Sequence, residues 1–192
     1  MKKFLLIAAV AAFAACNNDN AKVESMNAKD STTSKMSDEN LNYPYSSDYS
    51  HEFEMGDTKN AMSLLQLYKS WDANNLDEAK QYFAENNDSM FFSDGKMFAG
   101  SRDSLFSIAK QMRAGMGTVA DTVHAWVPLR SKDRNEDWVL IWTTEIATDA
   151  KGKTTARELH EAWRFDKNGK INMVRQYEAK SAMPPPPPPP KK

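Results

Sequence analysis

Hydrophobic residues in the first half of the central block recur at helical spacing. That spacing predicts helices over about 58–74, 76–83 and 101–114. Between the second and third helices, residues 88–93 have the composition of a short strand and are followed by Asp94-Gly95, a typical hairpin turn. The first part of the block is therefore mainly helical.

From residue 118 onward the period changes to two. Four strands are predicted over 118–129, 138–148, 154–165 and 170–178, separated by turns rich in Asp, Lys, Asn and Gly. Helices followed by a long antiparallel meander indicate an α+β fold, with three N-terminal helices packed on an antiparallel sheet.

The turn before the last strand sets the expected register. A three-residue loop with Gly169 in the left-handed position pairs Phe165 with Ile171, and therefore Glu161 with Arg175. The same face then carries Leu159, Trp163, Met173 and Tyr177. The preceding strand is expected to add Trp138, Leu140, Trp142 and Thr144. One aromatic face would thus hold a single acid opposite a single base, with His160 pointing outward.

The first residues have the pattern of a targeting signal. Lys2 and Lys3 precede the apolar run 4–15, which is shorter than the roughly 20 residues that a membrane span needs. The small residues before Cys16, the only cysteine, resemble a bacterial lipobox. We expect a signal peptide over 1–15 and a lipid on Cys16 that anchors the protein in the bacterial cell envelope. By resemblance to known sorting rules, Asn17 implies the outer membrane. The alternative is an ordinary signal peptide with an incidental cysteine.

A polar tether and a proline tail flank the block. Over 16–56, Ser, Thr, Asn and Asp dominate, which is typical of a flexible linker. At the end of the tether an aromatic cluster is expected to pack on the domain edge or to dock a partner: Tyr43, Pro44, Tyr45 and Tyr49. The tail, 181–192, contains seven prolines over 184–190 that form a polyproline rod of about 22 Å. It is a stiff solvated tail or a ligand for aromatic grooves. The domain itself is placed over 57–180.

Composition removes several classes of function. The chain has 25 basic and 26 acidic residues and no basic block, so no nucleic-acid partner is expected. With one cysteine and three scattered histidines (His51, His124 and His160), no metal site is expected. Nucleotide-binding, zinc-protease and serine-hydrolase motifs do not occur, and no cofactor is expected. The acids Asp88, Asp94, Asp121 and Glu145 are interpreted as turn, cap or surface residues.

Three segments resemble the nuclear transport factor 2-like superfamily, which includes SnoaL-like and ketosteroid-isomerase-like domains. They are Trp71-Asp72-Ala73-Asn74-Asn75-Leu76, Phe98-Ala99-Gly100-Ser101-Arg102 and the run from Trp163 to Ile171. The resemblance implies a cone-shaped fold over 57–180, whose curved sheet wraps a long helix and encloses a pocket. It also implies that Glu161 takes the place of the isomerases' oxyanion-hole acid. Their helical tyrosine falls near Leu67, one residue from Tyr68, and their catalytic base falls near Ser93, beside Asp94.

The expected partner of Glu161 decides between the functions. Arg175 beside it would lower the pKa of the carboxyl and leave it unable to donate a hydrogen bond, so no isomerase activity of that kind is expected. The favoured function is a lipid-anchored envelope protein whose cone binds a small, partly apolar ligand or a protein partner without catalysis. Its expected pocket residues are Tyr68, Trp71, Trp142, Glu161, Trp163, Arg175 and Tyr177. One alternative is a SnoaL-like cyclase, isomerase or hydratase with Glu161 as general base. Another is a structural module with a filled cone. Trp126, expected on the outer face, suggests a homodimer through the sheet.

Overall fold

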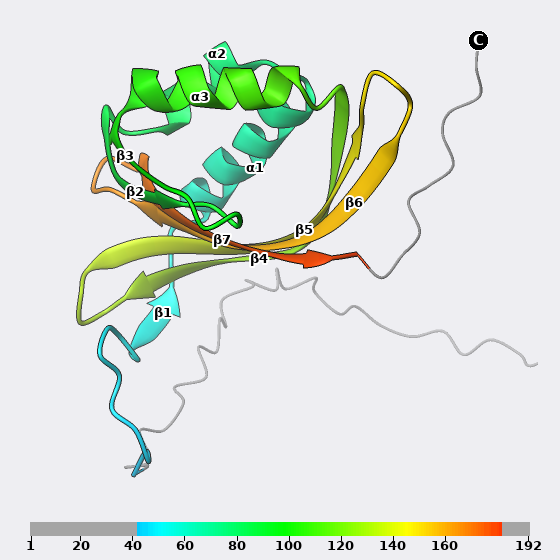
Figure 1. The fold of residues 1–192 in the computed structure, drawn as a ribbon. Coiled ribbons are helices and arrows are strands. Elements are labelled where there is room, and N and C mark those ends of the chain that lie inside the picture. The colour runs from blue at the N-terminus through cyan, green and yellow to red at the C-terminus, as the bar shows by residue number, and fades with distance from the viewer. Residues whose placement is uncertain (1–41, 182–192) are drawn as a thin grey trace, which may run out of the picture. The chain divides into compact units, whose positions relative to one another are not determined.

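Figure 1 shows the computed structural model of the chain, which describes residues 42–181. The chain divides after Pro44, and the architecture below is that of the described residues of the second unit, 45–181. The expected signal peptide, Cys16 and the proline run lie outside the described residues. No helix within 42–181 is long and apolar enough to span a membrane.

The described part contains three α-helices, a short 3-10 helix and seven strands. The helical elements are α1 (Thr58–Asp72), α2 (Leu76–Ala79), η1 (Lys80–Tyr82) and α3 (Arg102–Ala114). The strands are β1 (Phe53–Met55), β2 (Asn86–Phe91), β3 (Met97–Ser101), β4 (Thr118–Ser131), β5 (Glu136–Thr148), β6 (Thr154–Phe165) and β7 (Ile171–Lys180). The α+β class is confirmed.

One seven-stranded sheet forms the framework, in the order β1-β4-β5-β6-β7-β2-β3. All neighbours are antiparallel except β2 and β7, which are parallel. Two details of the expected architecture are therefore wrong. The helices do not precede the strands, because β1 comes before α1 and the β2–β3 hairpin lies between α2 and α3. The sheet is mixed, because that hairpin joins the free edge of β7.

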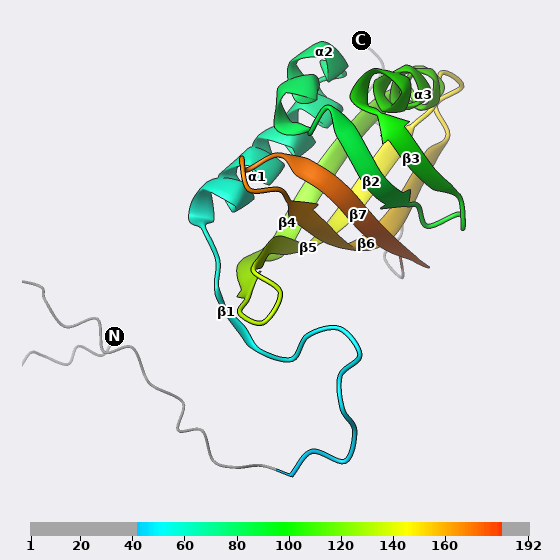
Figure 2. The ribbon, with the colours of Figure 1, turned by 90° about the vertical axis from the view of Figure 1, so that its left-hand side faces the viewer.

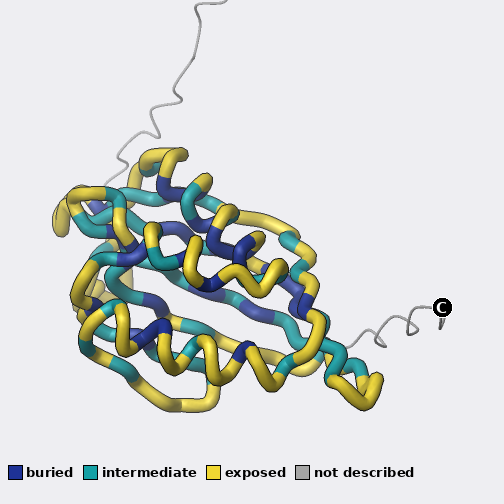
Figure 3. Tube along the Cα trace, turned by 90° about the horizontal axis from the view of Figure 1, so that it is seen from above, coloured by how far each residue is buried: buried dark blue, intermediate teal, exposed yellow. Residues whose placement is uncertain are grey.

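Helices α1 and α3 cover one side of the sheet, here called the helix side, and leave the opposite, outer side uncovered by helices (Figures 1 and 2). Each begins at a side-chain cap: Asp57 accepts from the backbone N–H of Lys59, and Ser101 from that of Ser104. Figure 3 shows buried positions concentrated on the strands and on the inner flanks of the helices. The core contains five large apolar side chains that are fully buried: Leu64, Met90, Val139, Ile141 and Ile171.

A β-bulge changes the register that the turn predicts. Phe165 pairs with Ile171 as expected, but the next pair is Arg164 with Met173, so Asn172 is an extra residue. Ile171 and Val174 are both buried although they are three positions apart, which a regular strand of period two does not allow. The bulge brings both into the core. The bulge also moves each side chain after it to the opposite side of the sheet from the one expected. The expected pairing of Glu161 with Arg175 is therefore wrong, and Glu161 pairs with Gln176.

Strand β5 faces the opposite way to the prediction. Val139 and Ile141, both completely buried, oppose Trp163 and Glu161 on the helix side. The even-numbered positions, including Trp142, therefore point outward. Trp142 was expected to occupy the interior, but the β-branched residues Val139 and Ile141 lie in the core with residues of α1 instead.

A second bulge, on β4, moves Trp126. The register shifts between Val123 and Ala125, so Trp126 opposes buried Ile141 and shares its side of the sheet, while remaining 49% exposed. The expectation that Trp126 lies on the outer side is wrong, because His124 is the additional residue in the strand.

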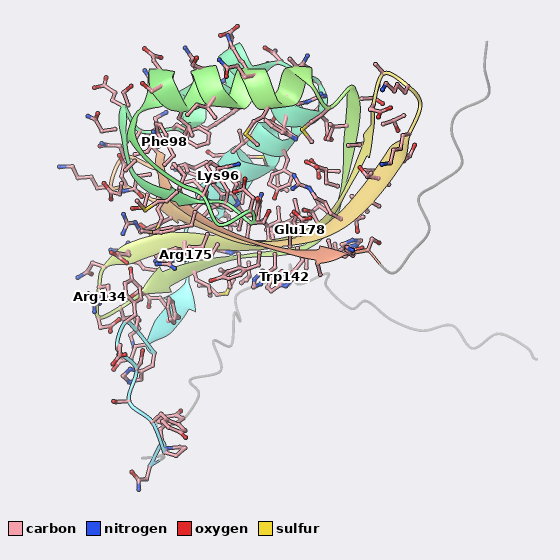
Figure 4. All side chains as sticks on the ribbon, in the orientation of Figure 1. Lys96, Phe98, Arg134, Trp142, Arg175 and Glu178 are labelled. Atoms are coloured by element: carbon pink, nitrogen blue, oxygen red, sulfur yellow. The ribbon has the colours of Figure 1, made fainter. Side chains whose placement is uncertain are left out.

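The folded region begins earlier than residue 57. Strand β1 pairs with the end of β4. Before it, the Tyr49 hydroxyl donates to Glu136, and the guanidinium of Arg134 lies 4.7 Å from the centre of the Tyr49 ring. Figure 4 shows Arg134 at the far end of the β4–β5 hairpin, where this segment packs. For Tyr49 the expected packing on the domain edge is confirmed, whereas Tyr45 is 88% exposed.

Candidate functional site

A cavity of about 550 Å³ lies between the helix side of the sheet, α1, α3 and the β2–β3 hairpin. Its walls are mainly apolar, with aromatic and aliphatic side chains from every bordering element: Leu67, Trp71, Met90, Phe92, Phe98, Leu105, Leu159 and Val174. Ile108 and Met112 of α3 also line it while 40% and 52% exposed, so they border its opening. A cavity of this size accommodates a small organic molecule. The alternative of a filled interior is therefore wrong.

Glu161 is at the polar end of the cavity and is 3% exposed. Three donors converge on its carboxylate: the Tyr68 hydroxyl, Trp163 Nε1 at 2.9 Å and Gln176 Nε2 at 2.6 Å. Burial raises the pKa of Glu161, and the three hydrogen bonds oppose that shift. Burial and the nearby Glu161 carboxylate hold the pKa of Tyr68 well above its usual range, so this phenol stays protonated and donates.

Asp121 of β4 is the most perturbed acid in the cavity wall. Burial, the Asp72 carboxylate and the Glu145 carboxylate raise its pKa from 3.8 to about 8. Its Oδ1 atom is covered by protein and has no hydrogen-bond partner among the described residues. Asp72 accepts from the backbone N–H of Asp121 at 3.1 Å. At neutral pH Asp121 is therefore mainly an uncharged acid in the cavity wall.

Arg157 supplies the positive charge of this wall. Its Nε atom donates to Glu145 at 2.8 Å, and Nη1 donates to Glu178 at 2.9 Å. Glu145, which is 4% exposed, also accepts from Trp71 Nε1 at 3.1 Å. Because this guanidinium is already bound to two carboxylates, it does not neutralise Asp121.

Arg113, near the end of α3, fixes the place where α1 meets β4. Although only 2% exposed, it bonds no carboxylate and donates instead to the backbone oxygens of Trp71, Asp72 and Gly117. It thereby holds the last turn of α1 beside the start of β4. This contact brings Asp72 next to Asp121.

The structure brings together four of the seven expected pocket residues. Tyr68, Trp71, Glu161 and Trp163 line the cavity, whereas Trp142, Arg175 and Tyr177 lie on the outer side of the sheet. Figure 4 shows Trp142 and Arg175 on that side and Glu178 on the helix side. Arg175 lies over the Phe91 ring at 4.6 Å. The premise used against isomerase chemistry, Arg175 beside Glu161, is therefore wrong.

Sequence reasoning missed the second half of the site. Asp121 and Glu145, interpreted as surface acids, line the cavity together with Arg157 and Gln176. The alternation of Val119, Asp121 and Val123 already places the acid on the apolar face of its strand. Gln176 could not be found this way, because the bulge after Ile171 reverses its direction. Within 42–181, no three His, Cys, Asp or Glu side chains are grouped so as to hold a metal ion.

Comparison with solved structures shows that the fold is nuclear transport factor 2-like. A protein of this fold and of unknown function from Exiguobacterium sp. 255-15 superposes with a TM-score of 0.52 at 14% identity, over 62% of this chain and 99% of that one. Another from Burkholderia pseudomallei K96243 gives 0.51 at 13% identity, over 65% and 92%. SalBIII, an epoxide hydrolase/cyclase-like enzyme in pyran ring formation in the polyether salinomycin, gives 0.50 at 12% identity, over 64% and 92%.

No family model matches the sequence. No curated protein matches it either. At these identities the structural likeness shows the fold alone.

Proposed function

We propose that the domain binds a small, largely apolar molecule in the cavity and transfers a proton to or from it through Asp121. Two observations carry this proposal: Asp121 lines the cavity, and burial together with the Asp72 and Glu145 carboxylates keeps its carboxyl mainly protonated at neutral pH. An acid with a pKa of about 8 is suited to proton transfer near neutral pH, because both of its protonation states are accessible there.

The two carboxyls take different roles in this proposal. Glu161 accepts three hydrogen bonds, which fix its position and reduce its readiness to take a further proton. Among the described residues Asp121 has no cationic partner, and the Asp72 and Glu145 carboxylates raise its pKa. We therefore assign proton transfer to Asp121, and to Glu161 the positioning of Tyr68 and Trp163. The ionised form of Asp121 would take a proton from the α-carbon of a carbonyl ligand, and the resulting neutral acid would return a proton to the ligand, so that the carboxyl is regenerated.

The likeness to SalBIII is compatible with this assignment. That enzyme is described as acting in pyran ring formation, and it has the same fold as this chain. In this chain the fold contains a cavity. The apolar walls favour a substrate with a hydrocarbon skeleton. We infer isomerisation, cyclisation or hydration as the reaction class, each of which needs an acid or base at the reacting carbon atoms, with water as the co-reactant in hydration.

Deuterium exchange into small ketones tests the proposal without knowledge of the natural substrate. Cyclic and α,β-unsaturated ketones are incubated with the protein in heavy water at pH 7, and deuterium at the α-carbon is measured by mass spectrometry. We expect exchange above that in buffer, and a loss of about 100-fold in Asp121→Asn. Arg175→Gln, on the outer side of the sheet, is the matched control and keeps full activity. Equal rates for Asp121→Asn and the unaltered protein would exclude Asp121.

A second candidate is binding without catalysis. It is favoured by the extensive hydrogen bonding of the other cavity acids, since Glu161, Glu145 and Glu178 all have partners. On this account ketones bind, as seen by native mass spectrometry, yet exchange no faster than in buffer. Both candidate functions therefore predict ketone binding, but only the first predicts deuterium exchange faster than in buffer.

We further propose that the protein is held in the cell envelope by a lipid on Cys16. Support comes from the apolar run 4–15, the small residues before the cysteine and the polar residues after it. Two or more acyl chains are needed for stable anchoring. The mass of the mature N-terminal peptide tests this, and Cys16→Ala should release the protein from the membrane fraction. If Cys16→Ala stays in the membrane fraction on washing, as the unaltered protein does, the lipid on Cys16 is not the anchor.

A further inference from the structure

An aromatic row crosses the outer side of the sheet, away from the cavity. It consists of Trp142, His160 and Tyr177, which are cross-strand neighbours on β5, β6 and β7. The Trp142 and His160 rings are stacked, with centroids 4.7 Å apart and planes 6° from parallel. The Tyr177 ring follows at 6.2 Å. Two stacked rings and a third tilted by 33° form a binding platform of a kind that proline-rich segments use.

The row is accessible although its side chains are large. Trp142 is 37% exposed and Tyr177 is 57% exposed. Figure 4 shows Trp142 projecting from the side of the sheet that carries no helix. Covering exposed aromatic surface of this kind lowers the free energy of the protein, which favours binding.

The described chain ends close to the row. Ser181 Oγ donates to Glu158 Oε1 at 2.7 Å. Glu158 lies two residues before His160 on β6, so both side chains are on the outer side, about 7 Å apart along the strand. The eleven residues that follow Ser181 in the sequence contain the seven prolines.

The lengths of the two partners agree. Ser181 lies four residues after Tyr177, or about 13 Å along the strand, so the chain must fold back to reach the row. Ala182 and Met183 together span up to about 7 Å of this distance, and the first prolines span the rest. The row crosses two strand spacings, or roughly 10 Å. Seven residues of polyproline helix extend about 22 Å, which is more than enough to cover it.

We propose that the proline run 184–190 of the same chain docks on the aromatic row Trp142–His160–Tyr177. A polyproline helix is already ordered before binding, so packing its rings on aromatic faces costs little conformational entropy. A two-residue connection keeps the effective concentration of the tail in the millimolar range, which favours a weak contact. A second copy of the chain is the competing occupant of this side of the sheet.

Hydroxyl-radical footprinting of the full chain tests the proposal. It is compared with a variant in which the seven prolines are replaced by alternating Gly and Ser, so that length and the final lysines are kept. We expect oxidation of Trp142 and Tyr177 to rise about twofold in the variant, because the rod no longer covers their rings. Trp126, also half-exposed but outside the row, is the internal reference and stays constant.

Two outcomes overturn the proposal. Equal oxidation of the row in both chains means that the tail does not cover it. Protection that depends on protein concentration and persists in the Gly/Ser variant means that a second copy is the occupant. As an independent check, the single change Tyr177→Ala should release the tail and raise oxidation of Trp142 and Met183, whereas Met55→Ala, distant on β1, should not.

Discussion

Replacing Asp121 by asparagine should make the protein more stable at neutral pH. In the folded state the pKa of Asp121 is about 8, whereas in the unfolded chain it returns to about 3.8. Between these values the folded state binds more protons than the unfolded state, so stability is greatest below pH 4 and falls as the pH rises towards 8. Asparagine has the same shape and carries no charge, so the variant avoids this loss.

The size of the effect follows from the pKa shift. One pKa unit corresponds to about 1.4 kcal/mol, so keeping Asp121 protonated at pH 7 costs at most about 4 kcal/mol. Asp72 and Asp121 interact and titrate together, so part of the shift belongs to Asp72. We therefore expect the free energy of unfolding to rise by between about 2 and 4 kcal/mol at pH 7 in the variant. The gain should shrink towards zero near pH 4.

Chemical denaturation at pH 5, 6, 7 and 8 measures this difference. The variant's unfolding free energy should depend less on pH than that of the unaltered protein. Asp77→Asn is the matched control: Asp77 is fully exposed and bonded to Lys110, so its replacement should leave the steep pH dependence in place. Parallel stability curves for Asp121→Asn and the unaltered protein would refute the assignment of a neutral, buried Asp121.

Three further changes test other parts of the site. Tyr68→Phe removes a donor to buried Glu161 and should cost about 1–3 kcal/mol in a denaturant titration, with no loss if the phenol does not bond the carboxylate. Arg157→Met leaves Glu145 without its cation and should cost about 3 kcal/mol, restored in part by Glu145→Gln in the same chain. Arg175→Gln should alter stability by less than about 0.5 kcal/mol and ketone binding not at all; a large loss in either would place Arg175 in the site after all.

The fold could be predicted because its signals are local. The N-caps at Asp57 and Ser101 and the long period-two runs each follow from a few neighbouring residues. Strand β1 was missed because three exposed residues show no alternation; it exists because it pairs with the end of β4. The parallel pairing of β2 with β7 is also nonlocal and leaves no mark in the sequence.

The candidate site could be predicted from the sequence only for residues that precede the bulge at Asn172. Glu161 and Trp163 precede it and face the cavity as expected, whereas Arg175 and Tyr177 follow it and face outward. A single extra residue, Asn172, separates the two outcomes. Its amide bonds both Arg164 and Asp88 on the outer side, a contact between three strands that the sequence alone does not indicate.

Carboxyl ¹³C NMR of Asp121 across pH 5 to 9 tests the central claim most directly. Titration near pH 8, with a further shift when a ketone enters the cavity, is the result that a neutral proton donor in the wall predicts. Titration near pH 4, unaffected by any cavity ligand, would mean that Asp121 is an ordinary charged carboxylate and would contradict the proposed chemistry.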